Sequence, residues 1–110
     1  MNTAARNAWH TIRRCVASER VRLLSHFTRR MDERGETWPD VLAVLDAPAA
    51  VRPDGADEWG RARRIISGEA ADGLPLGMVC VIGRDDAGDL TVFITLFWEA
   101  PGSKPTEGAT

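Results

Sequence analysis

The hydrophobic pattern of this 110-residue chain changes its period once, close to Pro48. Before that point apolar residues recur three and four positions apart, which indicates amphipathic helices. After it, short runs rich in Val and Ile alternate with turn residues, which indicates strands. Helices and strands that are segregated along a chain indicate an α+β fold. We therefore expect two or three N-terminal helices packed on one face of a three- or four-stranded antiparallel sheet, in a single domain over residues 1–99.

Three segments before Pro48 carry helical signals. The first covers residues 3–17, and the second runs from about residue 26 to 34. Ser25 is the expected N-cap of the second helix, and Gly35 suits the left-handed position that ends it. The third starts with a capping box and an early Pro, and is ended by Ala47-Pro48. The apolar stripes, which we interpret as core, are Trp9, Ile12 and Val16; Phe27 and Met31; and Trp38, Val41, Leu42 and Leu45.

The segments after Pro48 are expected to form a meander. Earlier in the chain, residues 19–24 fit either a short extended segment or a continuation of the first helix. Short connections make antiparallel pairing the expectation. The expected strands are residues 50–52, 61–67, 76–83 and 90–99, with a turn at 53–55, a loop at 68–75, a hairpin loop at 84–89 and a flexible tail at 100–110.

The formal net charge of −2 hides an asymmetry along the chain. Residues 1–35 hold eight arginines against three acidic residues, a net charge of +5, whereas residues 36–110 have a net charge of −7. Lys104 is the only lysine, and Arg is the better fork for phosphate. A GC-rich genome is the alternative cause of this arginine bias. The total charge therefore leaves room for a phosphate site, but limits it to a local patch.

The composition excludes several classes of function. No stretch reaches the length of a membrane span, and the N-terminus lacks the apolar core of a secretory signal, so we expect a cytoplasmic protein without a membrane partner. Cys15 and Cys80 lie far apart in apolar surroundings. We expect two buried reduced thiols, although the spacing leaves a disulfide open. Without a Cys/His cluster or a phosphate-binding loop, we expect no metal and no cofactor.

One string of residues resembles a known family. Residues 26–35 read His-x-x-x-Arg-Met-x-x-Arg-Gly. This resembles a family of short bacterial domains of unknown function that open with such a helix, and it looks like a distant cousin of the BrnT toxins, which belong with the RelE-like ribonucleases. The resemblance covers roughly residues 22–98. It implies a helix-then-sheet fold, metal-independent cleavage of RNA by scattered Arg and His residues, and neutralisation by a cognate antitoxin. This chain departs from such toxins in its acidic total charge and in its ending, Phe97-Trp98-Glu99.

His26 is the first candidate for chemistry. At the start of a helix the dipole favours the neutral ring, which suits a general base. Arg29 and Arg30 follow at i+3 and i+4, so a guanidinium lies one turn along the same face. A His beside an Arg can deprotonate a 2′-hydroxyl and hold the phosphate that it attacks. The alternative is a surface or capping His on a solvated arginine face. His10 is interpreted as structural or exposed.

The second candidate group lies on the strand that begins near residue 61. Arg61 and Arg63 share one face, while Arg64 lies on the other. If helices leave the first face uncovered, two guanidinium forks form a phosphate cradle there. The alternative is that these arginines pair with nearby acids such as Asp57 and Glu58. Trp59 is either a base-stacking residue or a core or lid residue.

Two hypotheses follow. The first is a RelE/BrnT-like toxin, a metal-independent ribonuclease with RNA and an antitoxin as partners. The second is a non-catalytic protein-interaction domain of the same fold, with a homodimer as one expected state, so whether the chain is an enzyme stays open. Glu99 is a further acid/base candidate at the sheet edge. For the ribonuclease the expected catalytic residues are His26, Arg30, Arg61 and Arg63, and the expected RNA-binding residues are Arg29, Arg34, Trp59 and Arg64.

Overall fold

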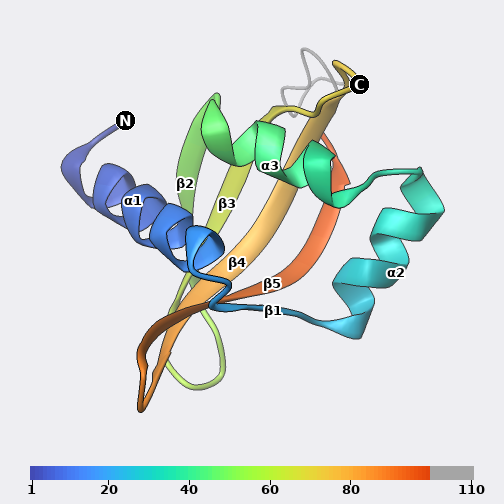
Figure 1. The fold of residues 1–110 in the computed structure, drawn as a ribbon. Helices are drawn as coiled ribbons and strands as arrows, with labels where there is room; N and C mark the ends of the chain where they lie inside the picture. The colour runs from blue at the N-terminus through green and yellow to red at the C-terminus, as the bar shows by residue number, and fades with distance from the viewer. Residues whose placement is uncertain (100–110) are drawn as a thin grey trace.

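The computed structural model describes residues 1–99, which form three helices and a five-stranded sheet (Figure 1). The α+β class is confirmed, and there is one more strand than expected. The predicted tail at 100–110 lies outside the described residues. The elements in chain order are α1 (Thr3–Ala17), β1 (Val21–Leu23), α2 (Ser25–Arg34), α3 (Trp38–Asp46), β2 (Ala50–Ala56), β3 (Ala62–Glu69), β4 (Pro75–Asp85) and β5 (Gly88–Trp98).

The sheet is mixed, with the strand order β1-β5-β4-β3-β2. The last four strands form an antiparallel meander, as expected from their short connections. The additional strand β1 pairs in parallel with β5, so that Val21 lies beside Thr91 and Leu23 beside Phe93. The expectation of a purely antiparallel sheet is therefore wrong at this edge. Because two helices and three strands separate β1 from β5, the chain can return in the same direction.

Local signals fixed the helix ends well. Gly35 ends α2 at a φ of 67°, and the carboxylate of Asp40 accepts hydrogen bonds from the N–H (2.7 Å) and hydroxyl (2.9 Å) of Thr37 at the start of α3. The prediction of Ser25 as an N-cap is wrong by one residue. The cap position is Leu24, and Ser25 is already inside the helix. The side chain of Leu24 is apolar and cannot accept a hydrogen bond, so α2 has no side-chain cap at its N-terminus.

The turn predicted at residues 53–55 is also wrong. β2 continues to Ala56, with an irregularity in its pairing after Pro53. A Pro is tolerated there because β2 is an edge strand. The chain reverses instead after Asp57, whose carboxylate accepts from the N–H groups of Trp59 (3.0 Å) and Arg61 (2.8 Å).

The helices cover one face of the sheet, and the main core lies between the helices and this face (Figure 1). Phe93 of β5 contacts Phe27 of α2 and Trp38 of α3, with ring centroids 5.4 and 5.9 Å apart. The indole N–H of Trp9 in α1 donates to the carbonyl of Leu45 in α3 at 2.7 Å. The expected core stripes are confirmed except at Leu42, which is half-buried and lines a surface pocket instead of joining the core. Fully buried members of this core include Ile12, Phe27, Val41, Val44, Ile66, Leu76, Met78, Cys80 and Phe93.

Two further expectations concern the cysteines and the membrane. Cys15 and Cys80 are both buried and free. Burial raises the pKa of the Cys80 thiol to about 12, against a small opposing effect of Arg64, so this thiol is not a nucleophile at neutral pH. Among residues 1–99, no helix has the length and apolar character needed to cross a membrane.

Candidate functional site

The opposite face of the sheet has no described helix on it. Side chains alternate between the faces of a strand, so Arg63 and Val81 point away from the helices while Ile66 and Met78 point toward them. Val79, Val81 and Val92 are nevertheless buried on this face. Long side chains cover them, because the stems of arginines pack on apolar surface while their charged ends stay in water. We call this surface the uncovered face.

Two glycines show how closely these side chains lie on the strands. A Cβ atom added at Gly83 would be 2.9 Å from a terminal nitrogen of Arg61, so this guanidinium lies over β4. A Cβ added at Gly77 would be 2.6 Å from the ring of Phe97 and 2.8 Å from a carboxylate oxygen of Glu99. The missing side chains therefore make the space that Arg61 and Phe97 occupy.

The arginines of the uncovered face are mostly paired with acids. Arg61 donates to Asp57 at 2.6 Å and Arg63 to Asp54 at 2.8 Å, and Arg52 lies 3.4 Å from Glu99. Burial raises the pKa of Asp57, but hydrogen bonds from the backbone and side chain of Arg61 outweigh it and hold this pKa below its usual value. The prediction that Arg61 and Arg63 share one face is confirmed, and this face carries no described helix. The alternative of pairing with nearby acids holds for Asp57, whereas the partner of Arg63 is Asp54 and not Glu58.

Arg22 differs from these arginines. It lies on β1, between the core residues Val21 and Leu23, and so points to the uncovered face. Within residues 1–99 it makes no ion pair. Arg22 is not among the site residues expected from the sequence, although the alternation of Arg and apolar residues at 20–23 indicates a strand with arginines on one face.

Arg22, Arg61 and Trp59 line an open pocket of about 400 Å³. The Trp59 side chain is 72% exposed, so its interpretation as a core residue is wrong. The guanidinium carbon of Arg61 lies 5.2 Å from the centre of the Trp59 ring, in cation–π contact. An exposed aromatic ring beside two guanidinium groups can stack on a planar ring and bind an anion next to it.

The His/Arg helix lies elsewhere. His26 Nδ1 is 3.2 Å from a terminal nitrogen of Arg29, and Arg30 lies 3.6 Å from Glu33. Because α2 packs on the helix-covered face through Phe27, the sheet separates His26 and Arg30 from Arg61 and Arg63. The structure therefore does not bring the four expected catalytic residues into one site.

The remaining candidates are also dispersed. Arg34 is half-buried at the end of α2, and its Nε has no hydrogen-bond partner among residues 1–99. Arg64 pairs in register with Cys80, so it lies on the helix-covered face, as predicted, and away from the Trp59 pocket. His10 is exposed on α1, where it stacks on Trp9.

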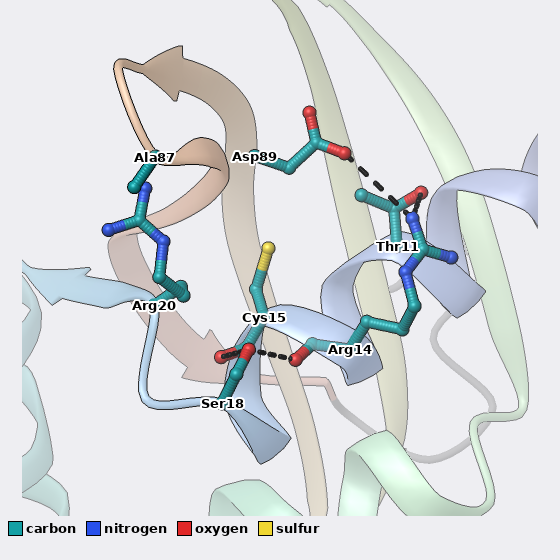
Figure 2. A pocket seen from close by; sticks show the side chains of 7 residues that line it. All are labelled: Thr11, Arg14, Cys15, Ser18, Arg20, Ala87 and Asp89. Carbon is teal, nitrogen blue, oxygen red and sulfur yellow. Dashed lines mark hydrogen bonds and ion pairs between the residues drawn. The ribbon is translucent and has the colours of Figure 1, made fainter.

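A second pocket, of about 310 Å³, lies between α1 and the β4–β5 hairpin (Figure 2). Its charged groups are paired across it. Arg14 lies 3.8 Å from Asp89, and Arg20 is bonded to Asp85 of the same hairpin. Figure 2 shows the Cys15 sulfur pointing between these arginine side chains. These ion pairs attach α1 and β1 to the β4–β5 hairpin. The charged side chains of the pocket therefore have a structural role.

Comparisons of this chain with protein-family models, curated proteins and solved structures gave no match. The class that the fold and site define is a small α+β protein whose sheet is covered by helices on one face and lined by arginines on the other. Its function is inferred from the geometry of the uncovered face.

Proposed function

We propose that this protein binds single-stranded RNA in the cytoplasm, on the uncovered face of its sheet. The observation that supports the proposal is the Trp59 pocket, which brings together an exposed indole, its cation–π partner Arg61, and Arg22, which makes no ion pair within residues 1–99. Stacking on an aromatic side chain contributes about 1–3 kcal/mol per base, and a guanidinium binds a phosphate through two parallel hydrogen bonds.

The charge of the uncovered face limits the size of the bound segment. Its four arginines, Arg22, Arg52, Arg61 and Arg63, lie against three carboxylates, and only the first has no acidic partner within residues 1–99. Phosphates must compete with Asp54 and Asp57 for the paired guanidinium groups. Stacking on Trp59 and the charge of Arg22 therefore provide most of the affinity, for a segment of one or two nucleotides.

Replacing Trp59 by Ala is expected to weaken the binding of a short single-stranded RNA by about 5- to 150-fold, which corresponds to the loss of one stacked base. Fluorescence anisotropy with a labelled oligonucleotide measures this change. Trp98→Ala is the matched control, since Trp98 is also exposed but lies at the end of β5 on the other face. Equal losses in both variants, or no binding by the wild type, would reject the proposal.

Replacing Arg22 by Gln is expected to reduce the salt dependence of the same binding. Each phosphate that a single strand contributes changes the slope of log Kobs against log salt by about −0.7. The variant should therefore lose about one such increment. Arg13→Gln should keep the wild-type slope, because Arg13 is an exposed arginine of α1 that pairs with Asp46 of α3. An unchanged slope in the Arg22 variant would exclude a phosphate contact at this residue.

A second candidate function, metal-independent RNA cleavage by a RelE/BrnT-like toxin with a cognate antitoxin, is favoured by the contact between His26 and Arg29. A guanidinium only donates hydrogen bonds, so His26 Nδ1 is the acceptor and a neutral ring holds its proton on Nε2. In this arrangement Nδ1 is occupied by Arg29 and Nε2 carries the proton, so the expected use of His26 as a base requires Arg29 to move and free Nδ1 to accept the proton of a 2′-hydroxyl. Absence of both RNA binding and RNA cleavage would favour the non-catalytic protein-interaction domain instead.

A further inference from the structure

Three carboxylates from two distant segments meet beside the start of α3. Glu36 lies in the link between α2 and α3, and Asp40 lies in the first turn of α3. Asp72 belongs to the tight turn between β3 and β4, in which its carboxylate accepts from the N–H of Leu74 at 3.0 Å. One oxygen of each residue lies within 4.8 Å of one oxygen of each of the others. We call this group the acidic cluster.

Glu36 is the most unusual member. It is only 5% exposed, and neither of its carboxylate oxygens has a hydrogen-bond partner among residues 1–99. The link holds it in place, because Gly35 takes its left-handed conformation just before it and the N–H of Glu36 donates to the carbonyl of Met31 at 2.9 Å. A buried carboxylate is normally paired with a cation or hydrogen-bonded, since burial of an unpaired charge is costly.

No arginine, lysine or histidine of residues 1–99 forms an ion pair with the acidic cluster. Asp40 accepts two hydrogen bonds from Thr37, which hold its pKa below the usual value and keep it charged. Burial and the charges of Asp72 and Asp40 raise the pKa of Glu36 to about 7. The described residues therefore provide no cation to balance the three carboxylates of the cluster.

We propose that Glu36, Asp40 and Asp72 bind a hard divalent cation, with Ca²⁺ preferred to Mg²⁺. All three ligands are oxygens, which hard cations require. The three oxygens lie within 4.8 Å of one another, so small movements of the side chains bring all of them to the Ca²⁺–oxygen distance of about 2.4 Å from one ion. Mg²⁺ requires shorter bonds in a near-ideal octahedron, whereas Ca²⁺ accepts longer bonds and a flexible geometry, which suits three carboxylates from separate segments.

The surroundings explain how the ion enters and what it connects. Asp72 is exposed, so it provides an opening to solvent and room for water ligands. Glu36 and Asp40 are buried and form the inner side. A bound ion would join the α2–α3 link to the β3–β4 turn. The cluster is separate from the Trp59 pocket, so this site does not depend on RNA binding.

The test is isothermal titration of the full-length, EDTA-treated protein with CaCl₂ alone and with MgCl₂ alone at pH 8. We expect one Ca²⁺ per chain and weaker Mg²⁺ binding. Glu36→Gln and Asp72→Asn should each lower the Ca²⁺ affinity by about tenfold or more. Asp86→Asn is the matched control, an exposed acid in the β4–β5 hairpin, and should keep the wild-type affinity.

The site is rejected if the wild type takes up no Ca²⁺, or if both cluster variants bind it as the control does. Equal affinity for Mg²⁺ would reject the preference for Ca²⁺. Circular dichroism checks that each variant is folded. If Glu36→Gln fails to fold, Asp72→Asn decides, because an exposed turn residue is replaced at little structural cost.

Discussion

In the absence of divalent cations, the free energy of unfolding of Glu36→Gln is expected to rise relative to that of the wild type as the pH increases. The change from pH 4 to pH 8 should be about 3 kcal/mol. The pKa of Glu36 is raised from 4.5 to about 7 in the folded protein, chiefly by burial and then by the charges of Asp72 and Asp40. The folded state therefore holds this proton more tightly than the unfolded state. Its contribution is fully present below pH 4.5 and is lost as the pH rises through 7.

Urea unfolding of both proteins in EDTA, across this pH range, measures the difference between their free energies of unfolding. The comparison removes the opposite effect of Asp40 and Asp85, whose pKa values are lowered and which favour folding at higher pH in both proteins. Glu58→Gln, which changes an exposed glutamate that makes no ion pair within residues 1–99, is the control and should show a nearly flat difference. A flat difference for Glu36→Gln as well would contradict the raised pKa.

The same measurement with Ca²⁺ added separates the proton from the metal as the partner of Glu36. Ca²⁺ binds the ionised carboxylate, so it is expected to stabilise the wild type at pH 8 and to reduce the advantage of the Gln variant. A response to Ca²⁺ at pH 8 that is absent at pH 4 would show both partners competing for one carboxylate. The pH dependence in EDTA holds whether or not Ca²⁺ binds.

Much of the fold followed from signals within a few residues of each other. The stripe in residues 3–17, the left-handed Gly35 and the pairing of Thr37 with Asp40 each depend on local geometry, and each is confirmed. The errors have a tertiary cause. β1 is a strand because β5 offers it an open edge, and Pro53 stays in β2 because that strand has a free edge of its own.

The candidate sites divide in the same way. The alternation in β3 was enough to place Arg61 and Arg63 on one face and Arg64 on the other, and their pairing with acids was foreseen as an alternative. The acidic cluster was missed, because residues 36 and 72 meet only through the packing of α3 on β3. Nothing in the neighbourhood of Glu36 in the sequence indicates that its side chain is buried.

The sheet divides the predicted ribonuclease site, and this limits how the chain could act as the proposed BrnT/RelE-like toxin. A single RNA strand cannot contact Trp59 and His26 through one flat surface, since these residues belong to opposite sides of the sheet. Either the strand passes around the β1 edge, where Arg22 precedes α2 by only two residues, or binding and cleavage are separate properties. Variants of Trp59 and His26 distinguish these two arrangements. Only a strand that passes around the β1 edge makes the effects of the two residues depend on each other.

Under the proposed ribonuclease function, replacing His26 by Ala is expected to lower the rate of RNA cleavage by about 10²- to 10⁴-fold, the usual contribution of one acid–base group. An unchanged affinity at Trp59 would indicate that binding and cleavage are separate, and a lowered affinity would indicate one strand that contacts both residues. The assay follows the products from a labelled RNA in EDTA, and growth after induced expression reports the same loss in cells. His10→Ala is the matched control, since His10 is exposed on α1. Cleavage at the wild-type rate by His26→Ala would remove this residue from the mechanism, and a wild type that binds RNA without cleaving it would leave the uncovered face as a binding surface alone.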